Sequence, residues 1–130
     1  MKAYIGIKYH EEFKNKEIVD EISSILEKNG YESICIVRDI IKEESNKYSS
    51  YELMKLTFEK IDTCDLVIID LTEKGVGVGI EAGYAYAKGV SIITIAKTGS
   101  DISETLEGIS KEILFYNSIE DIDMVLKGNI

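Results

Sequence analysis

The chain has 130 residues, and 24 acidic residues against 15 basic ones give it a formal net charge of −9. This length and a hydrophobic content of 45% predict one globular domain, residues 1–130, that buries roughly two-thirds of its unfolded surface. Because no basic cluster offsets the negative charge, nucleic acid and anionic membranes are poor partners. No apolar run reaches the roughly 18 residues of a membrane span and no signal-peptide pattern is visible, so we expect a cytoplasmic protein.

The residues that most often bind metals are few. Cys35 and Cys64 each lie in or beside an apolar segment, without CxxC spacing or a neighbouring histidine. We expect both to be reduced core residues, in preference to a disulfide or metal ligands. His10 is the only histidine, and the acids are scattered. We therefore expect no metal site, no cofactor and no Ser/His/Asp constellation.

Five short β-rich runs alternate with helical patterns, which is typical of a parallel sheet built from βαβ units. The third and fourth runs are almost continuously apolar, as expected for central strands covered by helices on both faces. Right-handed crossovers and five strands predict an α/β, flavodoxin-like three-layer sandwich with strand order 2-1-3-4-5. Its ligand crevice opens between strands one and three, so residues 4–10 and 70–83 are the candidates. The predicted strands are residues 2–7, 33–37, 66–71, 90–96 and 113–116.

Helix signals lie between these runs. Residues 18–26 carry apolar side chains at helical spacing and end at an Asn29–Gly30 C-cap. Ser49 and Glu52 form a capping box that starts a second helix, which directs Leu53, Leu56 and Ile61 inward. The polar segment 38–48 is expected to be a long loop, suited to a lid or a partner surface. Further helices are predicted from about Gly79 to Lys88, at 101–109 and at 119–126.

Residues 75–85, GVGVGIEAGYA, form the most unusual stretch and lie between a predicted central strand and a helix. The spacing Gly77-x-Gly79-x-x-Ala82 formally matches a dinucleotide fingerprint. We discount NAD binding of this kind because the fingerprint belongs after the first strand of its unit. In addition, Glu81 would compete with a pyrophosphate for the same backbone amides.

Glu81 is expected in the first turn of the third helix, where free N–H groups and the helix dipole keep it ionised at neutral pH. An ionised, immobilised carboxylate is a candidate nucleophile for the oxocarbenium-like sugar formed when a base leaves. The flanking glycines let a ligand ring approach the backbone. Spacing alone leaves a simpler alternative open, in which Glu81 is an ordinary first-turn acid and the glycines only form a turn.

Residues 76–85, together with Gly89 and the first-strand residues 3–6, AYIG, resemble the nucleoside 2-deoxyribosyltransferases and the related 2′-deoxynucleoside 5′-monophosphate N-hydrolases. The pattern extends over most of the chain, and it implies a flavodoxin-like fold. The resemblance also implies that Glu81 attacks C1′ of the deoxyribose and that Tyr4 hydrogen-bonds this nucleophile. Finally, it implies an obligate homo-oligomer whose sites a neighbouring chain completes, with residues 127–130 as a candidate contribution.

Three positions depart from the family pattern. Gly75 stands where the transferases have an aspartate and the hydrolases a serine, and Thr57 aligns with a family acid that assists proton delivery to the base. The phosphate-binding serine of the hydrolases corresponds to Ile7 or Lys8. Lys8 and the amides of residues 75–79 are candidate replacements for the missing hydroxyl. The predicted substrate-binding residues are Gly6, Lys8, Gly75, Gly77 and Gly79.

Asp70 ends the third strand at the crevice and is a candidate proton donor, because two close carboxyls raise the pKa of one of them. The alternative is an acid that caps the following loop. Glu73 is expected to be solvated, and His10 is expected to lie exposed in a loop instead of serving as a proton shuttle.

Three functions compete. The first, which we predict, is cleavage or transfer of the N-glycosidic bond of a 2′-deoxynucleoside or its 5′-monophosphate, with Glu81, Tyr4 and Asp70 as catalytic residues and a small-molecule nucleoside or nucleotide as partner. The second is a nucleotide-binding module of the same fold without catalysis. The third is a TIR-like NAD glycohydrolase. Release of free base separates the first two, and release of nicotinamide identifies the third.

Overall fold

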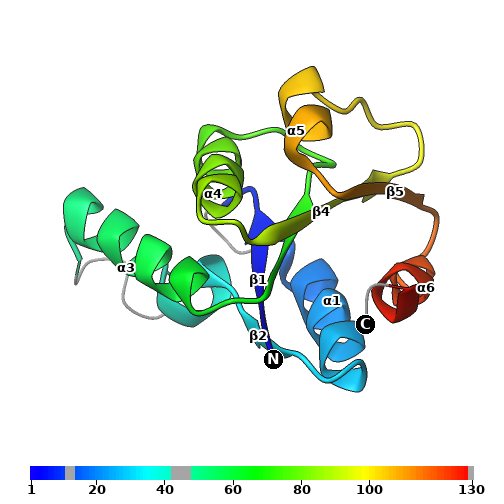
Figure 1. The fold of residues 1–130 in the computed structure, drawn as a ribbon, viewed down its shortest axis with the longest axis horizontal. Helices are drawn as coiled ribbons and strands as arrows, with labels where there is room; N and C mark the ends of the chain where they lie inside the picture. Colours follow the sequence, from blue (N-terminus) through cyan, green and yellow to red (C-terminus); the bar gives the residue numbers. More distant parts are fainter. Residues whose placement is uncertain (11–13, 42–47, 129–130) are drawn as a thin grey trace.

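The computed structural model describes residues 1–10, 14–41 and 48–128. They form a five-stranded parallel sheet in the order β2-β1-β3-β4-β5, with helices on both faces (Figure 1). This confirms the predicted fold class and strand order. The elements are β1 (Lys2–Ile7), α1 (Lys16–Lys28), β2 (Glu32–Ile34), the π-helical turn η1 (Val37–Ile41), α3 (Ser50–Asp62), β3 (Leu66–Asp70), α4 (Val76–Ala87), β4 (Ser91–Lys97), α5 (Glu104–Ile109), β5 (Glu112–Tyr116) and α6 (Asp121–Gly128).

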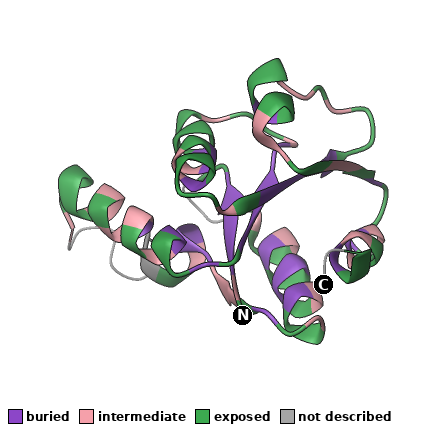
Figure 2. Ribbon diagram, in the orientation of Figure 1, coloured by how far each residue is buried: buried purple, intermediate pink, exposed green. Residues whose placement is uncertain are grey.

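The two faces of the sheet have separate cores. Strand side chains alternate between faces, so the three central strands β1, β3 and β4 each contribute to both cores. One core lies between the sheet and helices α3, α4 and α5. The other lies between the opposite face of the sheet and helices α1 and α6, and in both the facing residues are buried (Figure 2). On the α3/α4 face the buried strand residues are Tyr4, Val67, Ile69 and Ile92, and on the α1/α6 face they are Ala3, Ile5, Ile7, Leu66, Ile68, Ile93, Ile95 and Tyr116.

Helix α4 begins at Val76, three residues before the predicted start, so the glycine-rich stretch is itself helical. Val78, Ala82 and Ala85 recur at helical spacing and are buried against the sheet. This burial outweighs the low helix propensity of glycine. Glu81 is consequently the sixth residue of α4, beyond the free N–H groups of the first turn, and the expectation that it occupies that turn is wrong.

Strand β2 spans only Glu32–Ile34, and the predicted extension to residue 37 is wrong. The chain turns at Cys35 because its backbone N–H donates to the Asp39 carboxylate at 3.0 Å and its carbonyl accepts from the Asp39 N–H at 2.8 Å. The segment that follows is the helical turn η1 instead of a loop beginning at residue 38. Residues 42–47 of the predicted loop lie outside the described residues.

The capping box at the start of α3 is confirmed. The Ser49 hydroxyl accepts from the Glu52 N–H, and the Glu52 carboxylate accepts from the Ser49 N–H, both at 3.1 Å. Cys35 and Cys64 are buried and free, as predicted. Within the described ranges, no helix is long and apolar enough to cross a membrane, and no group of three or more His, Cys, Asp or Glu is placed to hold a metal ion.

Candidate functional site

A cavity of about 310 Å³ lies between the chain after β1, the N-terminus of α4, helix α3 and the segment after β2. The register of the sheet creates this position, since Ile7 at the end of β1 lies opposite Asp70 at the end of β3. The two loops that follow these strands therefore start side by side. The volume falls at the lower end of the range of small-molecule sites. Among the described lining residues, the polar ones are Tyr4, Lys8, Tyr9, Thr57 and Glu81.

Glu81 stands beside the buried face of α4 and directs its carboxyl toward β1. Its Oε2 atom is buried and has no hydrogen-bond partner among the described residues. Gly6 makes room for this carboxyl, because a Cβ added there would lie 3.8 Å from Oε2 and only 2.7 Å from Cδ1 of Ile69. A buried carboxyl oxygen without a protein partner marks a position where a ligand can supply the missing interaction.

Two effects act on the Glu81 carboxyl in opposite directions. Burial raises its pKa from 4.5 to about 7, and the Tyr4 hydroxyl lowers it by favouring the ionised form. The pKa of Tyr4 is itself raised well above 10.0, first by burial and then by the charge of Glu81. Tyr4 therefore keeps its proton near neutral pH. The expectation that Glu81 is simply ionised at neutral pH is wrong, because burial and not the helix dipole dominates its surroundings.

Lys8 and the glycine-rich helix start form the rim of the cavity. A Cβ at Gly75 would lie 3.4 Å from Cγ of Lys8, so the lysine stem packs where another residue would place its side chain. Gly77 also lines the cavity, and its Cβ position lies 4.0 Å from Oε1 of Glu81. Gly79 does not line the cavity, although it is predicted to bind substrate. Among the described lining residues, Lys8 is the only cation.

Helix α3 supplies a mostly apolar wall. Leu53, Met54 and Thr57 line the cavity from this helix, and Ile36 and Val37 extend the wall after β2. The Thr57 hydroxyl donates to the carbonyl of Leu53 at 2.8 Å within the same helix. Thr57, which the resemblance matches with a family acid, thus lies in the same cavity as Glu81, but it carries no acidic group for proton delivery to a leaving base.

Asp70 lies on the other face of the sheet. Leu66 and Ile68, whose side chains point to the same face of β3 as that of Asp70, belong to the core under α1 and α6. Its carboxylate accepts from the Tyr116 hydroxyl at 2.7 Å and from the Thr72 N–H at 2.9 Å. The predicted proximity to Glu81 is therefore wrong, and the arrangement matches the alternative of an acid that caps the following loop.

Other residues near the rim differ in part from expectation. Nε2 of His10 lies 2.8 Å from the Glu73 carboxylate across the loops after β1 and β3, so Glu73 has a partner as well as contact with solvent. Sequence reasoning did not identify Ile36, Val37, Leu53 or Met54 as site residues. The apolar pattern predicts that such residues are buried, but it cannot tell a core from a cavity wall.

The likeness to known proteins agrees with this geometry. The profile of the nucleoside 2-deoxyribosyltransferase family matches residues 3–124. A CMP N-glycosidase from Clostridium botulinum is 21% identical with a TM-score of 0.69, and the alignment covers 100% of both chains. A 2-deoxyribosyltransferase from Bacillus psychrosaccharolyticus is 16% identical with a TM-score of 0.77 over 97% of this chain and 96% of the other. Curated proteins gave no significant match. With its profile match over almost the whole length, the chain belongs to the nucleoside 2-deoxyribosyltransferase family.

Proposed function

We propose that this protein cleaves or transfers the N-glycosidic bond of a 2′-deoxynucleoside or its 5′-monophosphate, with Glu81 as the nucleophile at C1′. The family assignment supports a nucleoside deoxyribosyltransferase or N-glycosidase. The observation that carries the proposal is the Glu81 carboxyl, which lines the cavity beside Tyr4 and has a buried oxygen without a partner among the described residues.

The proposed reaction has two steps. In the first, a Glu81 oxygen bonds to C1′ while the C1′–N bond breaks, and its electron pair leaves with the base. Among the described lining residues there is no second carboxyl, so the base takes its proton from solvent. In the second step, water or another base bonds to C1′ while the C1′–O bond to Glu81 breaks. The carboxylate leaves with the electron pair, and the proton of the attacking group passes to solvent. The Tyr4 hydroxyl favours the carboxylate form that both steps require.

Lys8 supports a substrate that carries a 5′-phosphate. Its ammonium is the only cation among the described lining residues, and the stem of its side chain packs against Gly75 at the start of α4. Free N–H groups at a helix start favour anions, and a lysine adds a charge-assisted hydrogen bond. This combination replaces the hydroxyl that the related hydrolases place on the first strand.

A non-catalytic nucleotide-binding module is the second candidate. Gly75 and Thr57 favour it, because each lacks the acidic side chain of the transferases. A TIR-like NAD glycohydrolase is the third, and one substrate panel tests all of them.

The test is chromatographic detection of free base after incubation with deoxynucleosides, their 5′-monophosphates, CMP and NAD. CMP is included because one similar fold belongs to a CMP N-glycosidase. Base release by the wild type and not by Glu81→Gln is the expected result, and a second base added to the reaction separates transfer from hydrolysis. Absence of release from every compound, with dCMP still raising the melting temperature, would replace this proposal with the binding module.

The proposal includes a homo-oligomer that covers the cavity rim. Val76 and Ile80, one turn apart on α4, are 82% and 47% exposed, and Tyr51 at the start of α3 is 76% exposed. A second copy that buries these apolar side chains would also enclose the substrate. The predicted contribution of residues 127–130 has less support. Lys127 pairs with Asp123 on α6, and this helix packs on the face of the sheet opposite the cavity. Residues 129–130 lie outside the described residues. Light scattering of the wild type and Ile80→Glu, with a monomeric wild type as the contradicting result, tests this part.

A further inference from the structure

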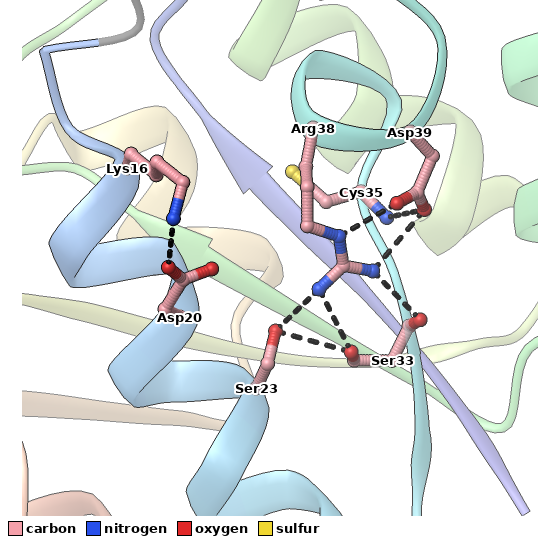
Figure 3. A network of polar contacts seen from close by, with 7 residues as sticks. All are labelled: Lys16, Asp20, Ser23, Ser33, Cys35, Arg38 and Asp39. Carbon is pink, nitrogen blue, oxygen red and sulfur yellow. Dashed lines mark hydrogen bonds and ion pairs between the residues drawn. The ribbon is translucent and has the colours of Figure 1, made fainter.

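We propose that Arg38, which does not line the cavity, is a positioning residue that holds the Ile36–Val37 wall in place for substrate binding. This inference rests on the proposed function of the cavity. Arg38 acts through a cluster formed by Ser23, Ser33, Cys35, Arg38 and Asp39, called here the Arg38 clamp (Figure 3).

The side chains of the wall are buried, Ile36 in the α3/α4 core and Val37 in the α1/α6 core, but the sheet does not hold the backbone that carries them. Strand β2 lies at the edge of the sheet and pairs with β1 only from Glu32 to Ile34. Ile36 and Val37 come after the last paired residue, and both line the cavity. A segment at a sheet edge without ladder hydrogen bonds keeps its position only if other groups hold it.

Asp39 closes the turn that carries these two residues. Its carboxylate accepts from the Cys35 N–H at 3.0 Å, and its own N–H donates to the Cys35 carbonyl at 2.8 Å. The two hydrogen bonds bracket Ile36, Val37 and Arg38 in one rigid unit. The backbone of the wall is thereby fixed in shape, although Asp39 alone does not attach it to the rest of the domain.

Arg38 provides that attachment. One terminal nitrogen donates to the Ser23 hydroxyl on α1 at 2.6 Å and to the Ser33 hydroxyl on β2 at 3.1 Å. The other donates to the Ser33 carbonyl at 2.9 Å and to Asp39 at 3.1 Å, while Nε donates to Asp39 at 2.6 Å. Figure 3 shows the planar guanidinium between the helix, the strand and the turn. A planar guanidinium with several fixed donors is suited to hydrogen-bonding with three elements at once.

Loss of the clamp has a specific consequence. Glu81 and Tyr4 stand on α4 and β1, and no side-chain hydrogen bond of the Arg38 clamp reaches either element among the contacts of the described residues. The clamp meets β1 through the sheet, where Ala3 pairs with Ser33. The reacting groups should therefore keep their geometry while the apolar wall relaxes. We expect weaker substrate binding with little change in the chemical step, which appears as a raised KM at nearly constant kcat.

The test compares Arg38→Ala, Arg38→Lys and Ser23→Ala with the wild type in the base-release assay. We expect KM to rise about tenfold in Arg38→Ala, less in Arg38→Lys, and about two- to threefold in Ser23→Ala, with kcat within about threefold of wild type. Lys16→Ala is the matched control, because it removes a cation and a 2.6 Å ion pair to Asp20 from the same helix without touching the clamp. Its KM should be unchanged.

A purely structural role gives a different pattern. If Arg38 only stabilises the fold, Arg38→Ala should have a lower melting temperature and a smaller active fraction. In that case kcat falls while KM stays at the wild-type value, and this result would overturn the inference. If Arg38→Ala does not fold, Ser23→Ala and Asp39→Asn carry the test, and an unchanged KM in both would overturn it equally.

A direct binding measurement separates this inference from the proposed function. If the wild type releases no base, the catalytic proposal fails, and calorimetry with dCMP then measures binding to the wild type and Arg38→Ala. An affinity about tenfold lower in the variant supports the positioning role. Equal affinities, or no binding of dCMP to the wild type, overturn it.

Discussion

The two faces of the sheet each contain an acidic residue close to the crevice, and the two acids have opposite surroundings. Asp70, on the α1/α6 face, is 1% exposed, and both of its oxygens accept hydrogen bonds. Glu81, on the α3/α4 face, borders a cavity and has a buried oxygen without a partner among the described residues. Burial by itself therefore does not mark a functional acid. The distinguishing feature is an interaction that the protein leaves unmade and that a ligand can complete.

The strongest way to break this comparison is Glu81→Gln. The amide keeps the size of the side chain and removes the nucleophile, so base release should fall by roughly 10³-fold or more. The melting temperature should stay the same or rise, because the variant no longer buries an ionisable carboxyl. Base release within tenfold of wild type by a folded Glu81→Gln protein would exclude Glu81 as the nucleophile.

For Asp70→Ala we expect a loss of stability with little change in activity, the reverse of Glu81→Gln. Removing the acceptor leaves the Tyr116 hydroxyl and the Thr72 N–H without their partner, so the free energy of unfolding should fall by about 2–4 kcal/mol. Urea denaturation measures this loss, and Asp101→Ala, at an exposed position, is the control. The kcat per folded molecule should change by less than about threefold. A large loss of kcat with unchanged stability would restore Asp70 as a proton donor.

Lys8→Ala sharpens the comparison at the rim of the cavity. Without the ammonium, KM for a 5′-monophosphate should rise about tenfold, while KM for the corresponding nucleoside should change little. Steady-state kinetics with dCMP and deoxycytidine measure the ratio, and Lys74→Ala, which removes a cation from the neighbouring loop, is the control. Equal increases for both substrates would argue against a phosphate at Lys8.

The smallest effect concerns pH. Because burial raises the pKa of Glu81 to about 7, activity should increase as pH rises through about 7. Tyr4→Phe removes the group that lowers this pKa, and the midpoint of the pH–rate profile should therefore move to higher pH. An unchanged midpoint would show that Tyr4 does not act on the carboxyl.

The stability of the folded chain should fall as pH rises, whereas its activity should increase. The pKa of Glu81 is about 7 in the folded chain against an ordinary value of 4.5. Its contribution to stability is therefore fully present below about pH 4.5 and is lost as pH rises through about 7. The melting temperature of the wild type should fall relative to that of Glu81→Gln over this window, and parallel curves would contradict the raised pKa.

The errors made from sequence have local causes. The glycine-rich stretch gave no sign that burial of Val78, Ala82 and Ala85 would make it helical, so α4 was predicted to begin three residues late. Strand β2 was predicted too long because its apolar residues continue past the last paired residue into a cavity wall. For Asp70 the sequence pattern does indicate the correct face. Asp70 follows Leu66 and Ile68 at every second position of β3, and this places it on the face away from Glu81.

The sequence by itself determined the layered α/β architecture, because strand and helix periodicities and capping residues act over a few residues. It also singled out Glu81 and Tyr4 through a short motif. The tertiary structure decided which carboxyl has partners, how burial sets the pKa of Glu81, and which buried apolar residues also line a cavity. These properties depend on contacts between segments far apart in the chain, as in the Arg38 clamp, and no local pattern encodes them.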